Sequence, residues 1–322
     1  MAQEQQRHGF FQYIHLKIIV TLFRVLMPWA SKERRNRDNA LVPQNIARER
    51  VKIPSRDAKR HILADLYYPP NYSSSSTSPV PILVNWHGSG FIMPLFGTDN
   101  FFCYRVARDA GIIVLDADYR KGPETPFPGA IHDVEDVLRW VATQNHRFDT
   151  SRIALSGFSA GGTLSTVAAT AIRKKLEDLI TVLVVFSLYP LLDFAAPVES
   201  KTVPKPVRAH PPFLLRLFND AYVPDESTRT DPLVSPNFAD AADFPETTVL
   251  VTCEGDILRP EADELAERLL RANVPNKTVI HKMLQGVPHG FDKGVKKGTV
   301  GWGRREELYT IVVKLLKDTL GL

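Results

Sequence analysis

From residue 82 to the end of the chain, short apolar segments alternate with segments of helical periodicity. The apolar, strand-length segments lie at 82–86, 112–118, 152–156, 182–190, 248–253 and 278–284. The helical patterns lie at 101–110, 130–145, 163–176, 261–272 and 304–320. Strands that are apolar throughout are typical of a parallel sheet with helices on both faces. The sequence therefore predicts an α/β fold with a mostly parallel central sheet, preceded by a pair of strands within 50–68.

Two segments depart from this alternation. Residues 1–45 hold an N-terminal helix pattern and a polar connector, whereas residues 193–244 hold eight prolines and one short helix pattern at 213–222. Long excursions in compact folds are often lids or binding loops. We therefore expect a helix and connector at 1–45 and one α/β domain at 46–322, which carries an insertion at about 193–244.

The N-terminal helix pattern is amphipathic. The apolar residues that recur at three- and four-residue steps are Phe11, Ile14, Ile18, Leu22, Val25 and Trp29. Lys17 and Arg24 interrupt the segment, and its uncharged runs, such as 18–23, are far shorter than the roughly 20 residues of a membrane span. We expect this stripe to pack on the protein in preference to a membrane surface, and the basic stretch 32–37 to be a solvated connector. A cytoplasmic location is expected, with membrane association or secretion left open.

Charge and cysteine usage limit the classes of partner. The net charge is +4 and the sequence pI is about 9.0, without a stripe of basic residues interleaved with aromatic ones. Nucleic-acid binding is therefore not expected. Cys103 and Cys253 lack metal-ligand spacing, and neither a metal ion nor another cofactor is expected. Homodimerisation is left open.

The pentapeptide GFSAG at 157–161 joins the apolar segment 152–156 to the helical pattern 163–176. Gly-x-Ser-x-Gly between a strand and a helix is the nucleophile-elbow motif of α/β-hydrolases. The turn holds the serine in strained backbone geometry at the carboxyl end of the sheet, and its small neighbours let the helix pass close to the strand. Ser159 is therefore the candidate nucleophile.

A glycine-rich turn, HGSG at 87–90, directly follows the apolar segment 82–86. Backbone N–H groups in such a turn can point at an oxygen that develops negative charge during acyl transfer. A further N–H would come from Ala160, the residue after the candidate nucleophile.

A serine needs a base to remove its proton, and α/β-hydrolases order these residues as serine, acid, histidine. Only His281 and His289 lie in the chain region where the base is expected. His281 falls inside a strand pattern, whereas His289 falls in a loop after it, which favours His289. Asp256, just past the apolar segment 248–253, is the favoured acid, with Glu254 and Asp263 as rivals.

In combination, these blocks resemble the hormone-sensitive-lipase-like branch of α/β-hydrolases, which includes carboxylesterases. HGSGF at 87–91 is similar to that family's HGGGF motif, and DYRKGPE at 118–124 is similar to its DYRLAPE motif. GFSAGG at 157–162 resembles its GDSAGG elbow. EGDIL at 254–258 and HGF at 289–291 resemble its DPL and HGF blocks.

The resemblance implies an α/β-hydrolase fold with a small helical cap, formed by N-terminal helices and the stretch before the acid. It also implies a serine esterase for carboxylic esters of small or medium acyl chains, with a specialised-metabolite ester or a lactone as further options. The implied catalytic triad is Ser159, Asp256 and His289. The implied oxyanion hole consists of the N–H groups of Ser89, Gly90 and Ala160, with Gly88 shaping the turn.

Three positions depart from the family pattern. Ser89 stands in place of the middle glycine, which keeps the backbone N–H but adds a side chain that could narrow the acyl pocket. Phe158 replaces the acid before the nucleophile, so that a polar contact is lost or replaced. Ile257 replaces the proline of the DPL block, which is a mild change.

Two other functions on this fold stay open. One is a small-molecule receptor that has lost catalysis, although receptors usually lack the serine or the histidine, and here all three residue types are present. The other is a non-hydrolytic lyase with a hydroxyl in the oxyanion loop, a position where Ser89 brings one.

Overall fold

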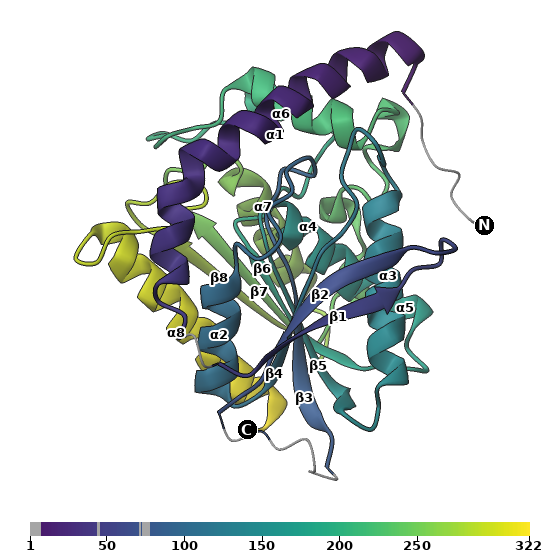
Figure 1. The fold of residues 1–322 in the computed structure, drawn as a ribbon, viewed down its shortest axis with the longest axis vertical. Helices are drawn as coiled ribbons and strands as arrows, with labels where there is room; N and C mark the ends of the chain where they lie inside the picture. The colour runs from purple at the N-terminus through teal and green to yellow at the C-terminus, as the bar shows by residue number, and fades with distance from the viewer. Residues whose placement is uncertain (1–7, 44–45, 71, 73–77) are drawn as a thin grey trace.

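The computed structural model has one eight-stranded sheet at its centre (Figure 1). It describes the chain except residues 1–7, 44–45, 71 and 73–77, and except the side chains of 27–31. The strands are β1 (Arg48–Pro54), β2 (His61–Tyr67), β3 (Val80–Trp86), β4 (Ile113–Ala117), β5 (Phe148–Phe158), β6 (Val182–Leu188), β7 (Thr247–Cys253) and β8 (Thr278–Leu284). Their order is β1-β2-β4-β3-β5-β6-β7-β8; β2 is antiparallel to both neighbours, and all other pairs are parallel. The predicted mostly parallel sheet is confirmed.

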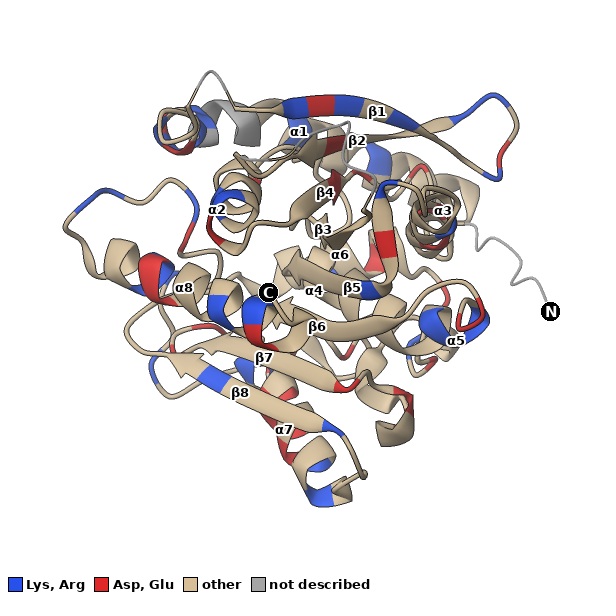
Figure 2. Cartoon of the chain, turned by 90° about the horizontal axis from the view of Figure 1, so that it is seen from below, with Lys and Arg blue, Asp and Glu red and all other residues tan. Residues whose placement is uncertain are grey.

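Helices cover both faces of this sheet, because its strands are apolar on both sides. One face is covered by α2 (Asn100–Ala110) and α8 (Val300–Leu320), whose apolar residues share a core with Val249 of β7. The opposite face is covered by α3 (Gly129–Thr143), α4 (Ala160–Val167) and α7 (Arg259–Ala272). After α4 the chain continues through a π-helical turn (Ala168–Ile172) into the short α5 (Arg173–Lys175). Basic and acidic positions alternate at the start of β1 (Figure 2).

The insertion contributes a helix, α6 (Pro212–Tyr222), and is anchored to α7. Glu261 of α7 accepts hydrogen bonds from the N–H groups of Leu192 and Asp193, at 2.8 and 3.0 Å. The same carboxylate pairs with the ammonium of Lys201, which lies inside the insertion. The start of this segment, residues 193–201, is therefore fixed to α7, although the division into cap and α/β domain stays a prediction.

The N-terminal helix α1 (Phe10–Asn39) runs across the top of the molecule in the view of Figure 1, next to α6. Its inner face buries Leu16 and Val20 against Leu217 and Ala221 of α6 and against Ile92. Apolar burial of this kind stabilises the contact between the two helices.

The stripe that we expected to be buried lies on the outer face of α1. Its described side chains are 42–85% exposed, and they are Phe11, Ile14, Ile18, Leu22 and Val25; the side chain of Trp29 lies outside the described residues. The prediction that this stripe packs on the protein is therefore wrong. The helix carries a second apolar set at helical spacing on its opposite face, and that set packs instead. Within the described part of the chain, no helix is long and apolar enough to cross a membrane.

The basic stretch 32–37 is also different from our expectation of a solvated connector, because it forms the last turns of α1. The guanidinium of Arg34 donates to the carbonyl oxygens of Gly290 and Lys293, and that of Arg37 donates to Gly294. These donors satisfy carbonyl groups of the loop that follows β8. The C-terminal half of α1 therefore holds this loop in place.

Asp38, at the end of the same helix, is buried against α8. Its Oδ1 accepts a hydrogen bond from Arg305 at 2.8 Å, and its Oδ2 accepts one from the N–H of Gly294 at 2.5 Å. Burial raises the pKa of Asp38, while the Gly294 N–H and the charges of Lys293 and Arg305 act in the opposite direction. Arg305 is fully buried, so this carboxylate neutralises a charge that water cannot reach.

We expect Asp38→Ala to lower the free energy of unfolding by about 3–5 kcal/mol, because it leaves a buried guanidinium without the carboxylate that accepts its hydrogen bond. Urea denaturation followed by tryptophan fluorescence measures this change. Glu33→Ala is the matched control in the same helix, since its carboxylate is 79% exposed and pairs with Arg37 one turn away. The control should change stability by no more than about 0.5 kcal/mol. Equal effects of the two substitutions would contradict the assignment of Asp38 as a buried anchor.

Candidate active site

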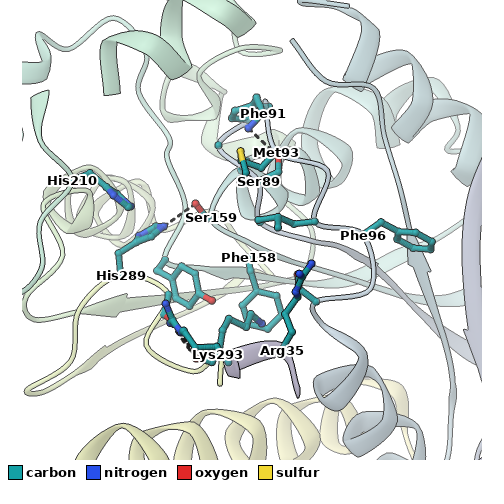
Figure 3. A pocket seen from close by; sticks show the side chains of 18 of the residues that line it. Arg35, Ser89, Phe91, Met93, Phe96, Phe158, Ser159, His210, His289 and Lys293 are labelled. Atoms are coloured by element: carbon teal, nitrogen blue, oxygen red, sulfur yellow. Dashed lines mark hydrogen bonds between the residues drawn. The ribbon is translucent and has the colours of Figure 1, made fainter. Parts of the chain in front are cut away.

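The structure brings Ser159, His289 and Asp256 together in one hydrogen-bonded chain. Nε2 of His289 lies 2.8 Å from Oγ of Ser159 (Figure 3), and its Nδ1 lies 2.6 Å from Oδ2 of Asp256. A carboxylate accepts and does not donate, so Nδ1 carries the ring proton and Nε2 can accept the proton of the serine hydroxyl. The three residues follow β5, β7 and β8, which places them at the carboxyl edge of the sheet.

The turn at Ser159 has the backbone geometry of a nucleophile elbow. Ser159 has φ 52° and ψ −118°, a conformation that residues other than glycine rarely adopt. Both flanking positions must be glycine because a side chain there would clash with the backbone. A Cβ on Gly157 would lie 2.0 Å from the carbonyl oxygen of Gly161, and a Cβ on Gly161 would lie 1.8 Å from the carbonyl oxygen of Trp86. The close passage of α4 over β5 and β3 thus depends on both glycines.

The two rival acids are engaged elsewhere. Glu254 accepts a hydrogen bond from the N–H of Gly286 at 2.8 Å. It takes no part in the hydrogen bonds that join Asp256, His289 and Ser159. Asp263 lies on α7, where it pairs with Arg259 at 3.1 Å and with His281 at 3.0 Å. Only Asp256, among the three acids considered, reaches His289.

Opposing effects set the pKa of His289. Burial lowers it, because the charged imidazolium loses water, but the charge of Asp256 and its hydrogen bond to the ring raise it. Asp292 adds to the upward direction, and the net pKa lies above the ordinary value of histidine. The geometry thus favours a ring that readily holds a proton taken from Ser159.

The glycine-rich turn lies beside the serine. A Cβ on Gly88 would lie 3.3 Å from Cβ of Ser159, and Gly90 has φ 55°, so the turn is both close to the serine and folded in a way that favours glycine. In the described part of the chain, the N–H groups of Ser89, Gly90 and Ala160 donate no hydrogen bond to the protein. All three residues line the cavity above the serine, so their donors are available to a ligand.

The hydroxyl of Ser89 makes two hydrogen bonds within the protein. Its Oγ accepts from the N–H of Phe91 at 2.9 Å (Figure 3) and lies 2.6 Å from the hydroxyl of Tyr119. The Tyr119 hydroxyl donates to the carbonyl oxygen of His87 at 2.7 Å. Because Tyr119 has one proton to give, Ser89 is the donor in the contact between the two hydroxyls. The chain of hydrogen bonds ties the turn to Tyr119.

Phe158, which stands where the family has an acid, is buried and packs edge-on against Phe102, with ring centroids 4.9 Å apart. The ammonium of Lys293 lies 3.5 Å from the centroid of the Phe158 ring. It also lies 2.8 Å from a carboxylate oxygen of Asp99 and 2.9 Å from one of Asp292. The polar contact expected to be lost or replaced is therefore replaced by a cation over the aromatic face.

Two residues near the site were missed by sequence reasoning. Tyr119 lies in the DYRKGPE block, which the resemblance singled out without giving this side chain a role. His210 lies in the insertion, and its ring centroid is 5.2 Å from that of His289. Burial, together with the charge of His289, lowers the pKa of His210 to about 4, so its ring is neutral near pH 7. No motif marks His210; only its place in a predicted binding loop could have indicated it.

A cavity of about 720 Å³ opens over the serine. Its walls include the glycine-rich turn, α1 through Phe23, and α6 through Leu214 and Phe218. Aromatic and aliphatic side chains make up most of these walls, while polar lining residues include His210 and His289 near the serine and charged residues such as Arg34 and Arg35 at the end of α1. Cavities of this size and character are typical of sites for small organic molecules.

Comparison with known proteins identifies the family of this chain. A family model described as alpha/beta hydrolase fold matches residues 83–293. Esterase LipI of Mycobacterium tuberculosis is 32% identical over 237 residues, which are 70% of this chain and 69% of LipI. Carboxylic ester hydrolase LipN of the same bacterium is 31% identical over 234 residues, which are 69% of this chain and 60% of LipN. The chain therefore spans less than two thirds of the length of LipN.

The fold is also similar to solved structures over nearly its whole length. An esterase from Pyrobaculum calidifontis matches with a TM-score of 0.78 and 25% sequence identity, covering 97% of this chain and 99% of the esterase. The chain belongs to the hormone-sensitive-lipase-like family of proteins with the α/β-hydrolase fold.

Proposed function

We propose that this protein is a serine carboxylesterase, which hydrolyses carboxylic esters through an acyl-enzyme on Ser159. The observation that carries the proposal is the continuous hydrogen-bonded chain from Asp256 through His289 to Ser159, at 2.6 and 2.8 Å. The N–H groups of Ser89, Gly90 and Ala160 beside the serine support it, because they donate no hydrogen bond within the described part of the chain. The esterase names of the relatives support it as well.

In the acylation step, Oγ of Ser159 attacks the carbonyl carbon of the ester while Nε2 of His289 takes its proton. The carbonyl oxygen gains a negative charge, which the N–H groups of Gly90 and Ala160, with that of Ser89, would stabilise. The imidazolium then gives its proton to the leaving alkoxide oxygen, so that the alcohol departs and the acyl group stays on Ser159.

In the deacylation step, water takes the place of the alcohol. Nε2 of His289 removes a proton from the water as its oxygen attacks the acyl carbon, and the collapse of the intermediate returns that proton to Oγ of Ser159. Asp256 keeps its charge throughout and stabilises the imidazolium. The neutral ring of His210 adds no charge that would oppose this imidazolium.

The substrate class follows from the cavity. Its volume of about 720 Å³ and its largely apolar walls suit a small-molecule ester with a small or medium acyl chain. A specialised-metabolite ester or a lactone fits the same chemistry, because both present one carbonyl carbon and one alkoxide leaving group.

The two alternative functions receive less support. A lyase would need a free hydroxyl in the oxyanion loop, but the hydroxyl of Ser89 donates a hydrogen bond to Tyr119 and accepts one from the N–H of Phe91. A receptor that has lost catalysis would not need the alignment of His289 between Ser159 and Asp256.

Ser159→Ala should lower the turnover of a p-nitrophenyl ester by about four to six orders of magnitude, because the acyl group has no oxygen to join. Labelling by a fluorophosphonate probe should disappear as well, while circular dichroism shows an unchanged fold. Ser151→Ala, at an exposed serine away from the cavity, is the control and should keep both properties. A Ser159→Ala variant that still turned over the ester or still reacted with the probe would contradict the proposal, and an unreactive wild-type protein would favour the receptor.

Asp256→Asn should lower kcat/KM by about a thousandfold or more, because the imidazole loses its partner and its tautomer control. The base must be neutral to act, so kcat/KM falls as pH drops through the pKa of His289. Asp256 raises that pKa, so its removal should move the acidic limb of the pH profile to lower pH. Glu254→Gln is the matched control and should keep the wild-type profile. Full activity in Asp256→Asn with loss of activity in Glu254→Gln would make Glu254 the acid.

A further inference from the structure

The outer face of α1 presents a continuous row of large apolar side chains to solvent. This row, the outer stripe, comprises Phe10, Phe11, Ile14, Ile18, Leu22, Val25 and Leu26, which are 42–85% exposed. The residues recur at helical spacing over more than four turns, so they share one side of one helix. Soluble proteins rarely leave a patch of this extent uncovered, and such patches mark docking surfaces.

The opposite face of α1 is occupied by the protein itself. Leu16 and Val20 are buried there against α6, and Lys17 and Arg24 both pair with Glu124 on the flank. The outer stripe therefore cannot be buried by a rotation of the helix, because that would expose the inner apolar set and break both ion pairs. Whatever buries the outer stripe must therefore come from outside the described fold.

The charge of the segment decides between two kinds of cover. Between Glu4 and Glu33 the sequence has no acidic residue but four Lys and Arg residues, which are Arg7, Lys17, Arg24 and Lys32. Lys17 and Arg24 share the single carboxylate of Glu124, so the segment keeps a net positive charge. Two copies that met through their outer stripes would bring two such basic helices side by side. A lipid surface with anionic headgroups would instead accept both the apolar side chains and the positive charge.

The outer stripe and the cavity lie on two sides of the same helix. Phe23 and Lys32 of α1 line the cavity over Ser159, whereas Leu22, one residue earlier than Phe23, belongs to the outer stripe. A lipid surface seated on the stripe would thus lie against the helix that walls the cavity.

We propose that the outer stripe of α1 docks the protein on an anionic lipid surface, with its apolar side chains in the region between headgroups and acyl chains. The proposal concerns binding and does not depend on ester hydrolysis at Ser159. It corrects our expectation from the sequence, in which packing of the same stripe on the protein was preferred.

The test is co-sedimentation of the full chain with vesicles of phosphatidylcholine, with and without phosphatidylserine. The stripe variant combines Ile18→Gln, Leu22→Gln and Val25→Gln, and should bind mixed vesicles on the order of 100-fold more weakly than wild type, because three partly inserted side chains lose apolar contact. Wild type should bind mixed vesicles more tightly than neutral ones, and added salt should reduce the difference.

A matched control variant carries three apolar-to-Gln changes on other surfaces, at Leu63, Leu179 and Leu270, which are 37–55% exposed. It should bind vesicles like wild type, and both variants should keep wild-type melting temperature and activity on a water-soluble ester. Equal vesicle binding by the stripe variant and wild type would overturn the proposal, and so would equal binding of wild type to neutral and anionic vesicles. Absence of vesicle binding together with a dimer that the stripe variant abolishes, measured by sedimentation velocity, would assign the stripe to a second copy instead.

Discussion

The close approach of three backbone segments at the centre of the sheet is the constraint on which the rest of the structure depends. Helix α4 begins so near to β3 and β5 that a single methyl group on Gly161 would overlap the carbonyl group of Trp86. This proximity forces Ser159 into its positive φ and lifts its side chain above the carboxyl edge of the sheet. Because β3 is the neighbour of β5, the glycine-rich turn after β3 is brought to the same point. The parallel sheet thus positions both halves of the candidate site.

Much of this arrangement could be predicted because it depends on patterns within short segments of the sequence. Apolar runs of strand length and helical periodicity located nearly every element of the α/β domain to within a few residues. The choice among Glu254, Asp256 and Asp263 was harder, since all three follow the same strand. That choice depends on how the loop after β7 is held: the N–H of Gly255 donates to the carbonyl oxygen of Val287, which sets the loop beside the one that carries His289. Contacts between distant loops have no signature in either segment alone.

The N-terminal helix shows a different limit of sequence reasoning. Its periodicity correctly indicated a helix, but two apolar sets share that periodicity on opposite faces. Which set is buried is decided by α6, whose residues Leu217 and Ala221 come almost two hundred positions later. The prediction of a solvated connector at 32–37 was wrong for a related reason, because the carbonyl groups that its arginines bind lie at 290–294. His210 was missed in the same way: it reaches His289 only through the fold of the insertion.

The contact between Asp38 and Arg305 has a consequence for folding during synthesis. The two residues are 267 positions apart, so the helix that ends at Asp38 leaves the ribosome long before its anchor exists. At about 5–20 residues per second, the delay is on the order of ten seconds to a minute. Until α6 has also been synthesised, about two hundred residues after Leu16, the inner apolar face of the helix has no folded partner, and the nascent chain is most prone to aggregate. Chaperone demand should therefore concentrate on the first forty residues, and the loop after β8 can settle only once synthesis is nearly complete.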